Sequence, residues 1–271
     1  MKKSLFMLAL AATVFIACDK DEKNDDVVVN DNFSEAILGK WLCVENYGKP
    51  MLTNVKYVTD IVSTSKAFMS MAARESGDTV EIWANRLEIG LVVDEKEKKF
   101  ILINKIDEKT KSEVEMSVTS FSADEMTTFG KTRQIKDSDT LDLYGYVFRF
   151  KKINVDYSDA IIGTWEGRCT SSDGSVFDDG ENHRWEYRSD GNYYYYYKEN
   201  GEWKLSEPVY SNYFVQGPML FTRWQNVGSD EKNNENWEIE SIKDNVMKWS
   251  ALRKKENGST YTVTFEMRKV Q

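Results

Sequence analysis

The sequence predicts an all-β protein made of two tandem small antiparallel barrels. Short runs that alternate apolar and other residues, such as "RLEIGLVV", "KFILINKI" and "YTVTFEMRK", follow one another with Gly, Asn and Asp turns between them. Regularly spaced short strands with such turns are typical of an antiparallel barrel or sandwich. Several motifs also occur twice in the same order, which indicates two copies of one domain.

The internal repeat sets the domain boundaries. "FSEAILGKW" begins at residue 33 and its counterpart "YSDAIIGTW" at residue 157, 124 positions later. The closing strands "YGYVFRFKKI" and "YTVTFEMRKV" match in the same way. We therefore expect one barrel over 33–155 and a second over 156–271, each of the usual size for a single core.

The first 17 residues (1–17) are predicted to be a lipoprotein signal peptide. A basic segment, "MKKS", precedes the apolar run "LFMLALAATVFIA", which has signal-peptide length and is short for a membrane span. A small residue directly before Cys18 resembles the lipobox, the cleavage and lipidation site of bacterial lipoproteins. The resemblance implies acyl chains, palmitate among them, on Cys18. The alternative is an ordinary signal peptide followed by an incidental Cys.

Residues 18–32 are expected to form an acidic tether. It begins "CDKDEKNDD", in which Lys20, Asp21 and Glu22 resemble the export signal that sends Bacteroidota lipoproteins to the outer face of the outer membrane. A solvated charged linker is the alternative interpretation of these residues.

One segment of the first domain departs from the strand pattern. "STSKAFMSMAARES", residues 63–76, contains helix-forming residues without alternation, so we expect a short helical insertion in the first barrel. Cys43 and Cys169 lie on the expected first strands of separate domains, where free, buried thiols are favoured over a disulfide.

Motifs at both ends of each domain resemble those of bacterial lipocalin-like domains. "ILGKW" and "IIGTW" resemble the Gly-x-Trp motif that opens such barrels, here Gly39, Trp41, Gly163 and Trp165. "WEYRSDGNYYYY" resembles a hairpin common in these domains. The resemblance implies small antiparallel barrels, often with an interior ligand site, and a cation over each motif Trp. The expected cations are Lys151 and Arg268.

The turn before the tyrosine run 193–197 decides which tyrosines face the interior. A two-residue loop at Asp190-Gly191 places Tyr194 and Tyr196 inside, whereas a three-residue loop with Gly191 in the left-handed conformation places the other three inside. The family-like spacing favours the three-residue loop. The residues expected to line the second barrel are therefore Trp185, Tyr187, Tyr193, Tyr195 and Tyr197. Tyr194 and Tyr196 then face outward and become candidates for an external contact.

Few residues are available for catalysis or metal binding. The single histidine, His183, is expected to be exposed at a strand entrance, and one histidine allows neither a His-pair metal site nor a duplicated triad. No phosphate-binding loop or nucleophile elbow is present, and no cofactor is expected. The acidic loop 171–183 lacks EF-hand spacing and is interpreted as a hairpin loop without a metal. The net charge of -9 argues against a nucleic-acid partner.

These features predict a lipid-anchored outer-membrane protein, facing the cell exterior, that binds a partner without catalysis. Its membrane contact would be made by the N-terminal acyl chains. The expected ligand is a small apolar or amphipathic molecule inside the second barrel, with a surface glycan or protein on the outer aromatic face as another option. The alternative is an accessory lipoprotein whose barrels are filled by their own side chains.

Overall fold

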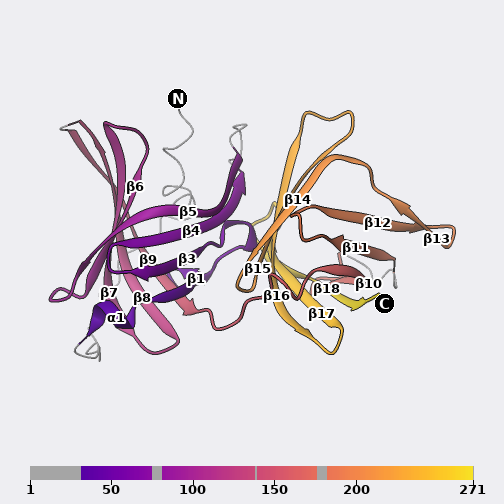
Figure 1. Ribbon diagram of the computed structural model, residues 1–271, viewed down its shortest axis with the longest axis horizontal. Coiled ribbons are helices and arrows are strands. Elements are labelled where there is room, and N and C mark those ends of the chain that lie inside the picture. The colour runs from indigo at the N-terminus through magenta and orange to yellow at the C-terminus, as the bar shows by residue number, and fades with distance from the viewer. Residues whose placement is uncertain (1–31, 75–80, 138, 176–181, 271) are drawn as a thin grey trace. The chain divides into compact units, whose positions relative to one another are not determined.

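The computed structural model describes residues 32–74, 81–137, 139–175 and 182–270. These residues form two compact units that are almost entirely strand (Figure 1). Their helical elements are α1 (Phe33–Ala36) and the 3-10 turn η2 (Thr53–Val55). The expected signal peptide and tether, with Cys18, Lys20, Asp21 and Glu22, lie outside the described residues.

The first unit is a closed antiparallel barrel of eight strands. Neighbouring strands pair in chain order, and the last strand pairs back with the first, so no edge of the barrel remains open. A two-residue strand, β2 (Lys49–Pro50), pairs beside β1. The barrel strands are β1 (Gly39–Asn46), β3 (Val58–Ser63), β4 (Lys66–Arg74), β5 (Glu81–Asp94), β6 (Lys99–Lys105), β7 (Thr110–Phe121), β8 (Glu125–Lys136) and β9 (Asp139–Lys152).

The expected helical insertion over 63–76 is wrong. Its described part is the end of β3 and the strand β4, which pair as an antiparallel hairpin. Met71, Ala72 and Ala73 are buried in succession, so both faces of this strand are covered near its end. A strand buried on both faces loses the polar–apolar alternation by which half-buried strands are identified.

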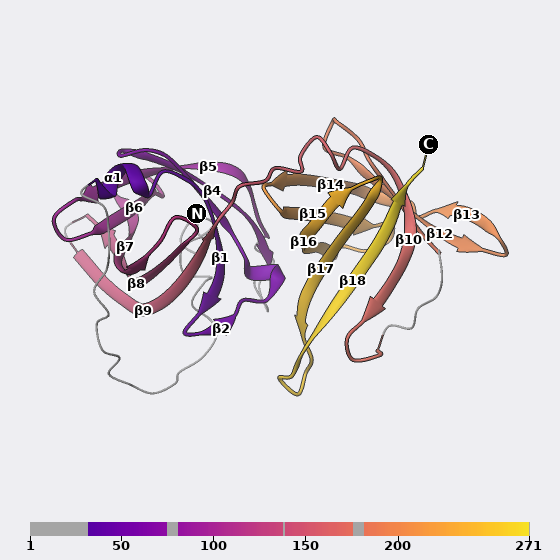
Figure 2. The ribbon, with the colours of Figure 1, turned by 90° about the horizontal axis from the view of Figure 1, so that it is seen from below.

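The second unit is a curled, open sheet of nine strands, a half-barrel (Figure 2). Its order is β13-β12-β11-β10-β18-β17-β16-β15-β14, so β13 and β14 are its two edges. An isolated bridge between Asn192 and Asn212 joins the start of β12 to β14. The strands are β10 (Gly163–Ser171), β11 (His183–Tyr187), β12 (Tyr193–Glu199), β13 (Glu202–Leu205), β14 (Pro208–Gln216), β15 (Met219–Asn226), β16 (Lys232–Lys243), β17 (Val246–Lys254) and β18 (Thr260–Lys269).

The short hairpin strand β13 explains why the second sheet stays open. In the first unit β4 is followed in the sheet by β5, but in the second unit β13 occupies the edge of β12 from Tyr196 to Glu199. Beyond the Asn192–Asn212 bridge, β12 and β14 therefore separate. In Figures 1 and 2 the β12–β13 hairpin extends away from β14–β18.

The two copies of the Gly-x-Trp motif form the same packed base. Trp41 Nε1 donates to Ile37 O over 2.8 Å, and Trp165 Nε1 donates to Ile161 O over 2.7 Å. Both indoles and both isoleucines are buried. Each barrel is therefore sealed at this end by an indole hydrogen-bonded to the turn that precedes its first strand.

The cation above each indole lies one residue later than expected. Lys152 Nζ is 5.0 Å from the Trp41 ring and Lys269 Nζ is 5.2 Å from the Trp165 ring. These lysines pair directly with the tryptophans across the strands. Lys151 and Arg268 are thus the wrong residues, because a one-residue shift moves a strand side chain to the opposite face.

Two segments from the first half of the sequence belong to the second unit, namely 52–56 and 72–74. Asn236 Nδ2 donates to Ala72 O over 2.7 Å, and the Leu252 amide donates to Thr53 Oγ1 over 2.7 Å. The second unit otherwise begins at Asn154. The repeat does not predict that these segments belong to the second unit, because both lie in the part of the first copy that has no counterpart in the second. Cys43 and Cys169 are both buried, as expected.

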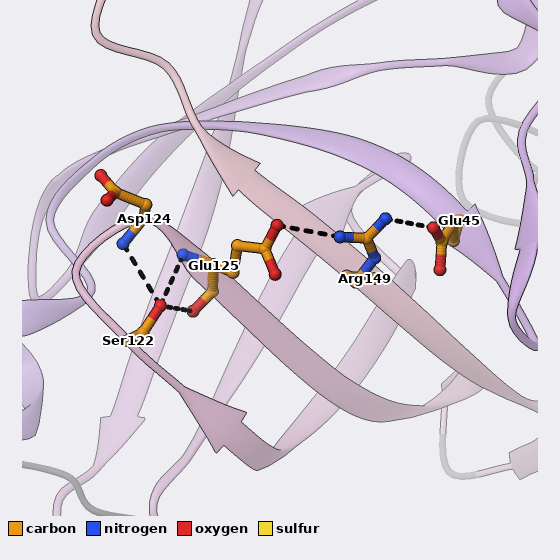
Figure 3. A network of polar contacts seen from close by, with 5 residues as sticks. All are labelled: Glu45, Ser122, Asp124, Glu125 and Arg149. Carbon is orange, nitrogen blue, oxygen red and sulfur yellow. Dashed lines mark hydrogen bonds and ion pairs between the residues drawn. The ribbon is translucent and has the colours of Figure 1, made fainter.

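An arginine on β9 joins three strands where the first barrel closes. Arg149 forms ion pairs with Glu45 of β1 and Glu125 of β8 (Figure 3), the second at 2.9 Å. Hydrogen bonding to Arg149 is the main cause that lowers the pKa of Glu45. Glu45 also lies at the irregularity in the β1–β9 pairing, so this contact supports the closure where the ladder is interrupted.

We expect Arg149→Met to lower the free energy of unfolding of the first barrel by about 1 kcal/mol at neutral pH, since the pair is partly exposed. The Glu45 pKa is lowered by folding, so its contribution is present above its unfolded value of 4.5 and is lost as pH falls through the folded pKa. Urea unfolding at several pH values from about 2 to 6 measures this dependence. Arg149→Met should make the free energy of unfolding depend less on pH. The control Lys109→Met removes a more exposed ion pair of the same barrel and should leave the pH dependence unchanged. Equal pH dependence in both variants would contradict the assignment.

Candidate functional site

The loop before the tyrosine run sets the register of β11 and β12. Gly191 has φ +81°, and Asp190 Oδ1 accepts from the Asn192 amide over 2.9 Å. Tyr187 pairs with Tyr193, as the three-residue loop predicted. Alternate tyrosines of β12 consequently share a face with Trp185 and Tyr187.

The five aromatic residues expected in the interior differ in how deeply they are buried. Tyr187 and Tyr193 are 2% and 4% exposed and belong to the core that contains Trp165 and Trp249. Trp185 and Tyr195 are half-buried, and Tyr197, at the far end of the run, is 42% exposed. The first pair therefore fills the half-barrel, whereas the next pair lies where its inner face reaches solvent.

The half-buried members form a connected aromatic group with two residues that were not predicted. The Trp185 and Tyr195 rings are 4.6 Å apart, and His183 stacks on Tyr195 with Nδ1 2.9 Å from its hydroxyl. Phe265 meets His183 edge-on at 5.2 Å and Trp185 at 6.1 Å. His183 was expected to be exposed, yet it is half-buried on the inner face. Its two-residue spacing from Trp185 was the signal that could have placed it there.

An ion pair adjoins the aromatic group through Trp237, whose ring lies 5.2 Å from that of Phe265. Glu235 at the start of β16 pairs with Arg253 at the end of β17, and Arg253 lies 5.1 Å from the Trp237 ring. Burial raises the pKa of Glu235 while Arg253 opposes that rise. Burial is also the main cause that raises the pKa of Tyr193, and the charge of Glu235 adds to it. The aromatic group thus has one half-buried pair of opposite charges beside it.

Tyr194 and Tyr196 lie on the opposite face of β12, as the register requires. They are half-buried rather than bare. The Arg188 guanidinium lies 4.2 Å from the Tyr194 ring, and the Tyr196 hydroxyl donates to Glu186 over 3.1 Å. Local charged side chains therefore cover part of both rings.

The acidic loop 171–183 is only partly described. Asp173 pairs with Lys255 and accepts from Ser175, and these contacts hold its pKa far below the ordinary value. Residues 176–181, with Asp178, Asp179 and Glu181, lie outside the described part. Among the described residues, no group of three His, Cys, Asp or Glu side chains could hold a metal. No helix in that part is long and apolar enough to span a bilayer.

Comparisons with known proteins identify no family. No protein-family model and no curated protein matches the chain. A DUF3598-family protein of unknown function from Nostoc punctiforme is similar over 89% of this chain and 98% of its own, with 10% identity and a TM-score of 0.24. Transferrin binding protein B from Neisseria meningitidis is similar over 79% of this chain and 59% of its own, with 9% identity and a TM-score of 0.26. Similarities this low establish neither a family nor a function.

Substitutions of two tyrosines of β12 test whether their burial differs as described. Tyr193→Ala should lower the free energy of unfolding of the second unit by about 3–5 kcal/mol, because it opens a cavity beside Tyr187 in the core. Tyr197→Ala should change it by only about 0.5 kcal/mol, since that ring is largely exposed. Urea unfolding followed by tryptophan fluorescence measures both. Equal losses in the two variants would show that Tyr193 does not contribute more to the core than Tyr197.

Proposed function

We propose that the protein is a lipid-anchored outer-membrane protein, exposed at the cell surface, that binds a small apolar or amphipathic molecule without catalysing a reaction. The binding site in this proposal is the aromatic end of the second unit, formed by His183, Trp185, Tyr195 and Phe265. The observation that carries it is a group of rings in contact with one another on an inner barrel face that remains half-open to solvent. Concave aromatic surface with a few polar groups is typical of ligand sites.

The depth of the core limits where such a ligand could lie. Trp165, Tyr187, Tyr193 and Trp249 pack together in the other half of the unit, so a ligand there would have to displace buried side chains. At the half-open end it would need only to cover exposed ring surface. The His183–Tyr195 contact lies within this group, and the Glu235–Arg253 pair adjoins it through Trp237. These polar groups favour an amphipathic ligand over a purely apolar one.

The second candidate function is that of an accessory protein with filled barrels. The observation in its favour is the packing of the interior core, which needs no ligand to complete it. Under this alternative the aromatic end would be an incompletely covered margin of the core, and the chain would act through its surface. The two candidates differ in whether a molecule occupies that end.

Native mass spectrometry of the lipidated protein extracted from its own membrane tests the ligand. We expect a bound small molecule in the wild type and its loss in Tyr195→Ala, because that ring lies 4.6 Å from Trp185 at the centre of the group. Trp203→Ala, which removes a ring from the outer face, is the matched control and should retain the molecule. A wild-type protein without any co-purified molecule, or equal retention in both variants, would favour the accessory role.

Protease shaving of intact cells tests the location. Replacement of Lys20, Asp21 and Glu22 by alanine should leave the protein in the membrane fraction but protect it from added protease, because only the export signal is removed. Cys18→Ala should instead release it from the membrane, since the acyl chains are its attachment. Equal shaving of the triple variant and the wild type would show that these three residues do not direct export.

A further inference from the structure

The outer face of β11, β12 and β13 carries three aromatic rings and three cations in one connected group. The members alternate across neighbouring strands and lie on the side of the sheet away from the core. We call this group the cation–aromatic face. It consists of Arg184, Arg188, Tyr194, Tyr196, Lys198 and Trp203.

Each ring of this face lies close to at least one cation. The Arg188 guanidinium is 4.2 Å from the Tyr194 ring, and the Arg184 guanidinium is 5.9 Å from Tyr196 and 4.5 Å from Trp203. Lys198 Nζ is 5.2 Å from Trp203. Such contacts restrict long side chains that otherwise move freely at a surface.

Two carboxylates hold the arginines in place from the same face. Glu166 of β10 pairs with Arg184, and Glu186 pairs with Arg188 at 2.6 Å. Glu186 also accepts from the Tyr196 hydroxyl. A partner that binds here would therefore meet side chains that are already ordered, which lowers the entropy lost on association.

The charge of this side of the sheet is opposite in sign to that of the chain. The outward positions of β10, β11, β12 and β18, with Arg188 just after β11, carry five cations and three acids, whereas the whole chain has a net charge of -9. The cations are Arg168, Arg184, Arg188, Lys198 and Arg268, and the acids are Glu166, Glu186 and Glu266. A local excess of cations favours a partner that presents carboxylates.

We propose that the cation–aromatic face docks a polypeptide partner through an acidic part of the partner's surface. Tyr, Trp and Arg are the residues that most often carry the binding energy of protein interfaces. A glycan is disfavoured because cations already lie over the Tyr194 and Trp203 rings, which sugar rings would have to displace in order to stack. The planar guanidinium groups can still donate hydrogen bonds to carboxylates or stack on aromatic side chains of a protein. This docking is separate from the ligand proposed for the inner face.

Site-specific photo-crosslinking in intact cells tests the proposal with the full-length lipidated chain. The photoreactive residue p-benzoyl-phenylalanine replaces Leu205, which ends β13 on the same side as Trp203 and is 40% exposed. The matched control places it at Val92 of β5, which is 50% exposed on the first unit. We expect an adduct at Leu205 that is absent at Val92. Mass spectrometry should identify it as a polypeptide joined within an acidic segment.

Two variants then ask whether the adduct depends on this face. Trp203→Ala and Lys198→Glu should each reduce the yield at Leu205 by about fivefold or more, the loss expected when an important interface side chain is removed or a favourable charge is reversed. Thermal unfolding of both variants checks that the second unit remains folded. An adduct that is a glycan or a lipid, a yield no higher than at Val92, or a yield unchanged by both variants in the folded protein would overturn the proposal.

Discussion

The indole at the start of each barrel is the contact on which both units depend. Its Nε1 donates to the carbonyl four residues earlier, which ties the entry turn to the first strand. The lysine paired across from it on the last strand covers the ring. Gly39 and Gly163 both have positive φ, and a Cβ at Gly163 would lie 2.7 Å from Lys269 Cε, so glycine provides both the turn and the room for the lysine. First and last strands are thereby joined at a sealed base.

From this common base the two units differ at one place in the strand order. The first continues from β4 to β5 and closes, whereas in the second the short β13 takes the edge of β12. This difference in strand order also changes how deeply the tyrosines of β12 are buried. Because β14 no longer covers the end of β12, Tyr195 remains half-buried while Tyr193, near the bridge to β14, is enclosed. The proposed ligand site thus follows from the insertion of one hairpin strand.

The sequence predicted the elements that local rules determine and missed those that depend on contacts between distant segments. The turn residues left two loop types open, and the spacing that resembles lipocalin-like hairpins selected the three-residue loop. That choice assigned every tyrosine of β12 to its face, since register follows from loop type. Burial of Ala72 and Ala73 on β4 removed the alternation that identifies a strand, so that segment resembled a helix. The cation above each indole was predicted one position too early, at Lys151 and Arg268, because two cations are adjacent at the ends of β9 and β18 and only the strand pairing distinguishes them.

The tyrosine run shows how one residue type serves two faces of a strand. On the inner face Tyr193 and Tyr195 meet other rings, because a cation placed deep in the core would lose its hydration without a partner to replace it. On the outer face Tyr194 meets Arg188, which keeps part of its hydration and its pairing with Glu186. The same side chain therefore packs by ring contact inside and by cation contact outside. It follows that substitutions at Tyr194 and Tyr195, although adjacent, remove different interactions and separate an effect at the inner site from one at the cation–aromatic face.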